Sequence, residues 1–459
     1  MPDIGLGPGA RDDDAGLRQR DILMLTTLCI GVLIAQVDTS VVNLAMQPIA
    51  QSYDASIGAL QWVLDGYNMT YAVLLLTGGL LADLYGRRRV FQTGAAVIGV
   101  ASLGCALAPN IAFLIVARLV AGVGSALLLP ASLAIVRVVW PEPRTRRHAL
   151  GVWASCNGLA FVIGPTVGGL LIEWFGWPSV FLVAMPLVIA ALVMAGLVVP
   201  ESADPAGRHF DLSGQILGAA ALGGLVFAGI DCHRGGPGWI YGLIVAGVAL
   251  PAFLTVERRT GAAALVPLEL FRHAPFSGAI VATAAMTFGI YGMIFLVPLL
   301  WQSTHLLSPE GAGLGLLPCA LLFFLVAPRS GHLANRFGVR VVTAGGTALI
   351  GFGLFVLALT DAARPLWAAE IGLALTGIGM GLNTGPLMSV AVGSVEAARS
   401  GTASALINVA RMTGATLGVA ILGAVFALLH GGSQGFRAAM LTGAAIQLTG
   451  AFVASLTIR

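Results

Sequence analysis

The sequence predicts an all-α integral membrane protein with about fourteen transmembrane helices, arranged as two six-helix bundles with two additional helices between them. The first observation is composition, because 57% of the 459 residues are hydrophobic and 10% are charged, whereas soluble domains carry about 25% charged residues. The second is a series of separate apolar runs, each close to the roughly 20 residues that one helical crossing needs. The third is an internal repeat that relates the two halves of the chain.

The apolar runs fall into three groups, which are separated by polar stretches rich in proline, acidic residues and arginine. The first group lies near residues 22–45, 59–82, 90–108, 111–136, 149–172 and 177–199. A middle pair lies near residues 212–230 and 239–256. The last group lies near residues 276–302, 313–331, 341–360, 366–389, 401–429 and 437–457. We therefore expect a cytoplasmic tail (1–21), an N-terminal six-helix bundle (22–199), two additional helices with cytoplasmic linkers (200–275) and a C-terminal six-helix bundle (276–459).

The arginines predict the orientation of these helices. Basic residues are retained on the cytoplasmic side of a membrane, and most arginines lie beside segments that are cytoplasmic if the N-terminus is inside. Three arginines fall on the other side, namely Arg234, Arg364 and Arg437, and Arg118 and Arg411 lie within apolar runs. An even number of crossings then places both termini in the cytoplasm. We expect a multi-pass protein of the bacterial plasma membrane.

The internal repeat consists of two short segments at corresponding positions of the two bundles. The first reads Gly79-Leu-Leu-Ala-Asp83-Leu-Tyr-Gly86-Arg-Arg88, and the second reads Gly331-His-Leu-Ala-Asn335-Arg-Phe-Gly338-Val-Arg340. Each follows an apolar run and leads into a short cytoplasmic turn. Duplicated halves with a binding site between them are typical of alternating-access carriers, so the repeat favours transport over sensing.

Residue types that are missing exclude several functions. The chain contains no lysine, and a Walker A site needs one to reach the nucleotide phosphates, so we expect no ATP-driven pump of that kind. The 5 cysteines are scattered and no histidines form an HExxH pattern, so we expect no metal site and no redox pair. We expect no cofactor, no nucleotide and no nucleic acid partner. Residues 1–21 lack an apolar core, so we expect neither a signal peptide nor a membrane crossing there.

Five motifs follow one another along nearly the whole chain. They are Asp38-Thr-Ser-Val-Val-Asn43-Leu-Ala, Trp62-Val-Leu-Asp65-Gly-Tyr67, Gly79-x-Leu-Ala-Asp83-x-x-Gly86-Arg-Arg, Arg118-Leu-Val-Ala-Gly122-Val-Gly124 and Gly164-Pro165-Thr-Val-Gly168-Gly169. In this order they resemble the motifs of the major facilitator superfamily, and specifically its fourteen-span drug:proton antiporter branch. The resemblance implies the fold of that family.

Three positions depart from the family pattern. Leu84 stands where the loop motif usually has a basic residue, and Asn335 replaces the acid of the second half. The segment Gly176-Trp-Pro178-Ser lacks the basic residue that is common after the tryptophan. We therefore expect a weaker cytoplasmic gate than the family usually has.

Asp38 is the residue most informative about mechanism. It lies well inside the first apolar run, where insertion of an acid costs about 2.5 to 3.5 kcal/mol, so it needs a partner, water or a proton. A carboxylate in a cavity that is alternately wet and dry can take up and release a proton. Asp65 and Arg118 lie at a similar depth, and the resemblance ties Arg118 to proton coupling. The alternatives are a static ion pair for Asp38, hydration of Asp65, and hydrogen bonds from Arg118 to backbone carbonyls.

Two groups of residues are expected to serve conformational change rather than substrate contact. The cytoplasmic gate motif consists of Gly79, Asp83, Gly86, Arg87 and Arg88. Its acid could bond the arginines in one state and lose those bonds in the other, although the arginines could instead only fix topology. The antiport helix motif consists of Gly158, Gly164, Pro165, Gly168 and Gly169. Its small residues allow close helix approach, and its proline bends the helix.

The substrate cavity is expected to contain aromatic and polar side chains from several apolar runs. Aromatic rings can stack on aromatic or cationic ligands, but aromatic residues near span ends often anchor a helix at the membrane interface. The candidates are Tyr67, Phe161, Phe288, Tyr291, Asn408 and Arg411. Arg411 lies in the middle of its run with no evident acidic partner in the second half, and the sequence assigns it no role.

These features predict a secondary active transporter, and not an enzyme, that exports small amphipathic drugs or secondary metabolites by proton-coupled antiport. The proton gradient would supply about 1.4 kcal/mol per pH unit, and about 2.3 kcal/mol per charge for each 100 mV. The expected partners are the small-molecule substrate, protons and membrane lipids, and the expected state is a monomer. Two alternatives stay open: a carrier of one specific metabolite, for import or export, and a transporter-like receptor.

Overall fold

The computed structural model describes residues 19–204, 211–232, 236–260, 266–360, 366–396 and 400–458. Most of the expected cytoplasmic tail, together with Arg234 and Arg364, lies outside the described residues. Within the described residues the chain forms a succession of helices joined by short turns.

Residues 19–204 form an N-terminal unit, which we call the N unit. It contains α1 (Gln19–Val41), the 3-10 helix η1 (Val42–Ala45), α2 (Met46–Tyr53), α3 (Ile57–Tyr85), α4 (Arg87–Ala106), α5 (Ile111–Val139), α6 (Pro143–Phe175), α7 (Ser179–Leu182) and α8 (Ala184–Val198). The helices α1, η1 and α2 follow one another end to end and form a single rod, as do α7 and α8.

The second half of the chain forms a C unit. It contains α11 (Ala274–Ser303), α12 (Pro309–Gly315), α13 (Leu317–Val326), η4 (Ala327–Arg329), α14 (Ser330–Phe337), α15 (Val339–Ala358), α16 (Leu366–Gly393), α17 (Ser400–Leu428) and α18 (Gly432–Thr457). Between the two units lie α9 (Leu212–Asp231), α10 (Gly238–Thr260) and the short η3 (Leu268–Arg272). Each predicted apolar run coincides, within a few residues, with a helix or with helices joined end to end.

In the described residues, 12 helical stretches are long and apolar enough to cross a membrane. The helices α3 and α16 are not among them, although they have 29 and 28 residues. At 1.5 Å per residue each is about 40 Å long, which exceeds the roughly 30 Å of a bilayer core. Polar residues such as Gln61, Asp65 and Asn68 lower the hydropathy of α3. The chain is therefore a multi-pass membrane protein, in which α3 and α16 have the length of a crossing but are not among the 12 apolar stretches.

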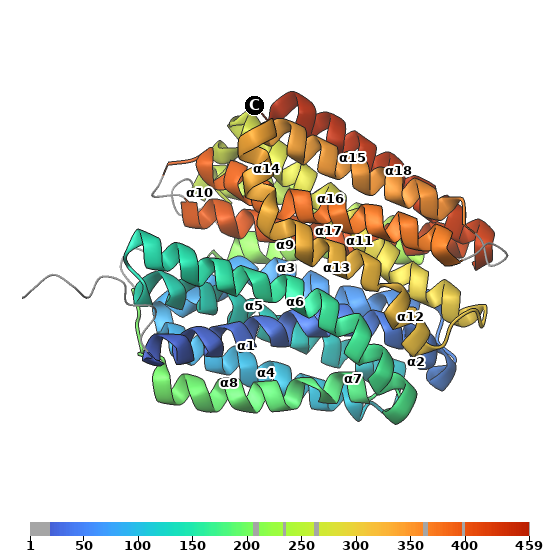
Figure 1. Cartoon of the computed structure of the whole chain (residues 1–459), viewed down its shortest axis with the longest axis horizontal. Coiled ribbons are helices and arrows are strands. Elements are labelled where there is room, and N and C mark those ends of the chain that lie inside the picture. Colours follow the sequence, from blue (N-terminus) through green and yellow to red (C-terminus); the bar gives the residue numbers. More distant parts are fainter. Residues whose placement is uncertain are drawn as a thin grey trace, which may run out of the picture.

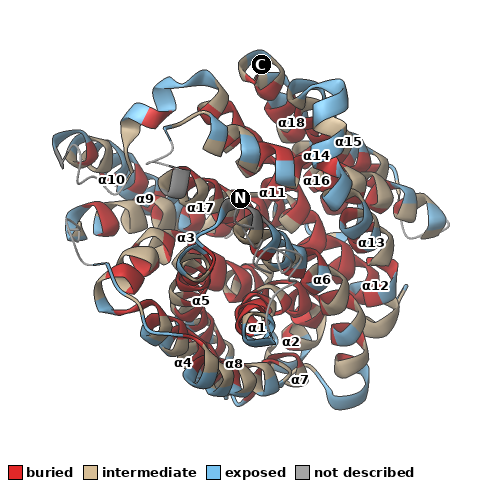
Figure 2. Cartoon of the chain, turned by 60° about the vertical axis from the view of Figure 1, so that its left-hand side comes forward, coloured by how far each residue is buried: buried red, intermediate tan, exposed pale blue. Residues whose placement is uncertain are grey.

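The N unit and the C unit lie side by side, with the long helices of both running in roughly the same direction (Figure 1). In Figure 1, α1 begins at the left, and α2, α7 and α12 lie at the right. We call the end at which α1 begins the near end and the opposite end the far end. A view closer to the helix axes shows that buried residues face the interior of the bundle and exposed residues lie at its rim (Figure 2).

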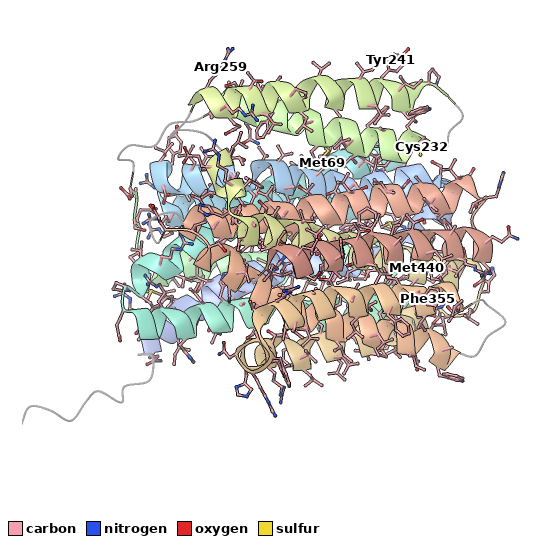
Figure 3. All side chains as sticks on the ribbon, turned by 90° about the horizontal axis from the view of Figure 1, so that it is seen from above. Met69, Cys232, Tyr241, Arg259, Phe355 and Met440 are labelled. Atoms are coloured by element: carbon pink, nitrogen blue, oxygen red, sulfur yellow. The ribbon has the colours of Figure 1, made fainter. Side chains whose placement is uncertain are left out.

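The additional helices α9 and α10 lie against the junction of the two units. Gln215 of α9 bonds α3, because its amide nitrogen donates to the Val73 carbonyl and its amide oxygen accepts from the Thr77 hydroxyl. On the other side, Val226 and Ile230 of α9 pack against α17 of the C unit. Figure 3 shows α10, marked by Tyr241 and Arg259, as the outermost helix on this side. The pair therefore covers the seam between the units from outside.

The internal repeat is visible in the backbone. Gly86 joins α3 to α4 with φ 104° and ψ 127°, and Gly338 joins α14 to α15 with φ 88° and ψ 139°. Residues with a Cβ rarely adopt this region, whereas glycine does so without strain. The two halves thus make the same sharp turn with the same residue at corresponding positions.

Close helix packing generates a first prediction. A Cβ on Gly78 of α3 would overlap the Ala126 carbonyl of α5, whereas a Cβ on the adjacent Gly79 would lie 3.6 Å from the Pro130 side chain, an ordinary contact. We expect Gly78→Ala to lower the free energy of unfolding by about 1–3 kcal/mol, as overpacking does, and Gly79→Ala to leave it nearly unchanged. Thermal unfolding of the purified variants in detergent measures both. Equal stability of the two variants would contradict the close α3–α5 contact.

Candidate functional site

A buried ion pair joins α1 to α5. The Nη1 atom of Arg118 donates to both carboxylate oxygens of Asp38, at 2.8 Å and 2.6 Å. The two side chains are 1% and 3% exposed, so the pair is almost completely removed from solvent. Arg118 also contacts a third helix, because its Nε donates to the Val63 carbonyl of α3 at 3.0 Å. The structure therefore brings together two of the three residues predicted to couple protons, and supplies the partner that Asp38 needs in a membrane.

Aromatic rings enclose the Arg118 guanidinium. Its central carbon lies 4.6 Å from the ring centroid of Tyr67 and 5.8 Å from that of Phe181, within the range of cation–π attraction. The Tyr67 hydroxyl is held in turn by the Ser125 hydroxyl at 2.7 Å and the Ala35 carbonyl at 3.0 Å. Tyr67, which the sequence suggested as a cavity residue, is 1% exposed and lies beside the ion pair, inside the N unit.

Asp65 has a different environment from Asp38. It lies two residues after Val63 on α3, is fully buried, and neither carboxylate oxygen has a hydrogen-bond partner. Gln61 and Asn68, one turn before and one turn after it, are also buried. Gln61 is used in a contact between the units, because its amide nitrogen donates to the Val419 and Ala420 carbonyls of α17. Asp65 is thus buried without a protein partner, and such surroundings favour the neutral carboxylic acid over the carboxylate.

Residues of the antiport helix motif contact two different helices. Added Cβ atoms on Gly164 and Gly168 of α6 would overlap Ser40 and Val41 of α1, which lies in the same unit. A Cβ on Gly169, in contrast, would lie 2.9 Å from the Pro309 carbonyl at the start of α12, in the other unit.

Two further members of the motif also contact the C unit. The Pro165 carbonyl faces Gly313 of α12, and Gly158 packs against Phe324 of α13. On α6, Gly164 and Gly168 therefore pack against α1. The other motif residues, Gly158, Pro165 and Gly169, contact the C unit.

The two units are joined most directly at the far end. Gln302, near the end of α11, donates to the Leu44 carbonyl of η1 at 3.1 Å, and the α6–α12 contacts lie beside it. The Gln61 bonds to α17 lie in the same half of the molecule. The hydrogen bonds between the units that the described residues form are therefore gathered toward the far end.

The cytoplasmic gate motif lies at the near end. Arg87 Nε and Nη2 both donate to Asp83 Oδ1, at 3.0 Å and 2.7 Å, across the turn at Gly86. The segment after α8 completes this arrangement, because the Glu201 carboxylate accepts from the backbone N–H groups of Arg88 and Arg89. Glu201 thereby caps the first turn of α4, where a negative charge is favourable. The sequence reading missed this residue, which lies 113 positions from Arg88.

The remaining cavity candidates are either packed between helices, as Phe288 and Phe161 are, or partly buried. Phe288 is packed between helices of the C unit, with its carbonyl against Gly418 of α17. Phe161 makes an edge-to-face contact with Phe323, with ring centroids 5.7 Å apart, between α6 and α13. Tyr291, Asn408 and Arg411 are partly buried.

Two other contacts were not foreseen. Gln36 of α1 donates to the Asn157 side chain of α6 at 2.7 Å. Cys29 and Cys156, on the same two helices, lie in side-chain contact, although the sequence reading recognised no close cysteine pair. In the part of the chain that the structure describes, no group of three or more histidine, cysteine or acidic side chains is placed to hold a metal ion.

The ion pair generates a second prediction. Asp38→Asn or Arg118→Gln alone leaves one buried charge without its partner, which costs about 3–5 kcal/mol, whereas replacing both removes both charges. We expect each single variant to unfold more readily than the double variant Asp38→Asn/Arg118→Gln. A double-mutant cycle of unfolding free energies in detergent measures the coupling. If the loss of unfolding free energy in the double variant equals the sum of the two single losses, the ion pair is contradicted.

Comparison with known proteins places this geometry in a family. Residues 28–419 match the family model described as Major Facilitator Superfamily. The multidrug resistance protein Stp of Mycobacterium tuberculosis is 35% identical over 418 residues, which cover 90% of this chain and 77% of that protein. The tetracenomycin C resistance and export protein of Streptomyces glaucescens is 33% identical over 417 residues, covering 90% and 77%. The multidrug efflux pump LfrA of Mycolicibacterium smegmatis is 31% identical over 407 residues, covering 88% and 81%.

Solved structures support the same fold. A crystal structure of a bacterial homologue of the human lysosomal transporter Spinster, in an inward-facing and unoccupied conformation, superposes with a TM-score of 0.69. Its sequence is 17% identical, and the match covers 97% of this chain and 98% of that one, so the likeness concerns the fold alone. From the family match, the relatives and the fold together, the chain belongs to the major facilitator superfamily and is a membrane transporter rather than an enzyme.

Proposed function

We propose that this chain is a proton-coupled antiporter that exports small amphipathic molecules across the bacterial plasma membrane. In this proposal α3 and α16 also cross the bilayer, which gives fourteen crossings, as in the drug:proton antiporter branch. The near end then faces the cytoplasm with both termini, in keeping with the arginines there. The energy comes from the proton gradient without a cofactor. The partners are the small-molecule substrate, protons and lipids, and the working unit is a monomer.

The observation that carries the proposal is the contrast between the two buried acids. Asp38 is balanced by Arg118, whereas Asp65 is fully buried without a hydrogen bond. A carboxylate in that position is costly unless it binds a proton. If α3 and its neighbours move apart in another state, water reaches Asp65 and the proton can leave. Such a group takes up a proton in one state and releases it in the other, as coupling requires.

The ion pair offers a route by which this exchange could be linked to helix movement. Arg118 holds α1 through Asp38 and α3 through the Val63 carbonyl, and Val63 is two residues from Asp65. A change in the position of α3 therefore changes the surroundings of both acids. Arg118 carries a fixed charge that is not lost at any physiological pH.

The contacts at the far end support an alternating-access cycle. The bonds of Gln302 and Gln61 hold the two units together there, so this state corresponds to a transporter closed toward the outside. In our proposal the α6–α12 contact separates when the far end opens, while Gly164 and Gly168 keep α6 attached to α1. The gate motif and Glu201 rearrange at the near end in the same transition.

The direction of transport rests on the relatives. Stp and LfrA are named for multidrug resistance and multidrug efflux, and the Streptomyces glaucescens protein for resistance and export. Export of amphipathic compounds is the activity these names share. A protein named as a probable actinorhodin transporter, from Streptomyces coelicolor, is 32% identical over 440 residues, which favours export of one specific metabolite as the second candidate.

Transport in proteoliposomes tests the proposal. One proton exchanged for one neutral substrate molecule supports about tenfold accumulation per pH unit. With vesicles acidic inside, we expect at least one dye from a cationic, neutral and anionic amphipathic panel to accumulate. Asp65→Asn and Asp38→Asn should each reduce the accumulation ratio to about one. Asp54→Asn is the matched control, because Asp54 is exposed with φ 49°, a conformation that asparagine also tolerates.

Each result has a defined meaning. Accumulation that survives in both Asp38→Asn and Asp65→Asn would remove these acids from the coupling path. Failure of the wild type to move any dye would favour a carrier of one specific metabolite or a receptor that binds without transport.

The far-end contact generates a further prediction. A Cβ on Gly313 would overlap the Pro165 carbonyl of the other unit, so Gly313→Ala should disfavour this closed state by about 1–3 kcal/mol. The reporter is Gln302→Cys in a background without native cysteines. With Gly313→Ala present, we expect this cysteine to react with an impermeant maleimide from outside at least fivefold faster than without it. Gly311→Ala is the control on the same helix, because its Cβ would meet only side chains of the same loop and helix. Unchanged labelling would contradict opening at this contact.

A further inference from the structure

Arg411 is a partly buried charge to which the proposed proton mechanism gives no task. It lies on α17, eleven residues after the helix begins at Ser400, which is about 16 Å along the axis. Its Nε is sealed from solvent and has no hydrogen-bond partner, and its guanidinium forms no ion pair with the described residues. A charge at this depth normally has a partner, because an isolated one is costly.

The other charges in the middle of the membrane do not balance it. Asp38 is occupied by Arg118 on both carboxylate oxygens. Asp65 accepts no hydrogen bond from Arg411 or from any other described residue. Because a guanidinium stays protonated, the centre of the protein carries a net positive charge whenever Asp65 holds its proton.

Arg411 lies where both units meet. The helix that carries it, α17, packs against α3 of the N unit and against α11 of the C unit, and Arg411 acts electrostatically on Tyr71 of α3 and Tyr291 of α11. Within the described residues, neither tyrosine hydroxyl forms a hydrogen bond. Unlike Arg411 Nε, both hydroxyls keep some solvent-accessible surface. The terminal nitrogens of Arg411 are likewise not sealed off. One guanidinium and two phenol groups therefore present unused N–H and O–H donors at the boundary between the units.

We propose that Arg411, Tyr71 and Tyr291 form an anion-binding subsite, and that the cargo includes amphipathic acids. The arginine would pair with a carboxylate, sulfonate or ionised phenol, to which its planar donors are suited. The two tyrosines would donate to the same group and flank an aromatic body with their rings. The subsite rests on the proposed transport function, because it gives that function a substrate class. Its depth places it well below the lipid headgroups.

Binding to a matched pair of probes tests this subsite without requiring transport. Pyrene butyrate and pyrene butylamine share an aromatic body and differ in the sign of their charge. Energy transfer from tryptophan to pyrene, titrated on the full chain in a neutral detergent with empty micelles as the blank, gives both dissociation constants. We expect the wild type to bind pyrene butyrate at least tenfold more tightly than pyrene butylamine.

Variants then assign the preference to one side chain. Arg411→Gln should weaken pyrene butyrate binding about tenfold or more, because the charge-assisted hydrogen bonds to the anion are lost, and leave pyrene butylamine nearly unchanged. Arg411→Lys should retain most of the preference, and Arg411→Glu should reverse it. Arg437→Gln is the control, because Arg437 is an exposed arginine on α18 and should change neither constant.

The outcomes separate the subsite from the transport proposal. Equal or tighter binding of pyrene butylamine by the wild type would overturn the subsite, even if the Arg411 variants failed to fold. Equal loss of both probes in a folded Arg411→Gln protein would also overturn it, and would point to Arg411 as an internal partner of Asp65. An anion preference that depends on Arg411, in a protein that moves no dye, would support the subsite and count against transport.

Discussion

The Asp38–Arg118 ion pair is the interaction on which the geometry of the N unit depends. Two opposite charges inside a membrane protein are stable only together and only with good hydrogen-bond geometry. Here the pair joins α1 to α5 and reaches α3 through the Val63 carbonyl, so three helices must keep a fixed register. Tyr67 and Phe181 fill the space around the guanidinium. Any movement of one of these helices changes the surroundings of a charge, and this is why our proposal gives the pair a part in proton coupling.

Small residues decide where the helices remain together and where they can separate. Lipid tails are as apolar as side chains, so helices in a bilayer associate through close packing rather than through the hydrophobic effect. On α6 this principle serves two purposes, because Gly164 and Gly168 fit against α1 in the same unit whereas Gly169 fits against α12 in the other. Both contacts lie in one buried cluster, which includes Val41 of α1 and Ala312 of α12, so they differ in the unit that they join and not in their burial. One motif therefore packs its own unit and also reaches the other.

The sequence predicted the helices well and their contacts poorly, for a physical reason. Hydropathy reports depth, so the apolar runs and the depths of Asp38, Asp65 and Arg118 followed directly from it, and Gly86 and Gly338 revealed the repeat. The direction in which a side chain points around its helix axis is a separate property, and helices that are apolar on all sides carry little information about it. For this reason the sequence did not indicate that Tyr67 encloses the ion pair or that Glu201 caps α4. The unpaired state of Asp65 and the contact between Cys29 and Cys156 were hidden for the same reason.

The sign of the cargo charge determines which part of the proton gradient can drive export. Exchange of one inward proton for one outward cation moves no net charge, so only the pH difference contributes, at about 1.4 kcal/mol per unit. Exchange of one proton for one outward anion moves two charges in the favourable direction when the inside is negative, which adds about 4.6 kcal/mol per 100 mV. A carrier that selects anionic cargo through an unpaired arginine between its units would thus gain a driving force that persists when the pH difference is small. In the proposed antiport cycle, the position of Arg411 consequently bears on the energetics of transport as well as on the choice of substrate.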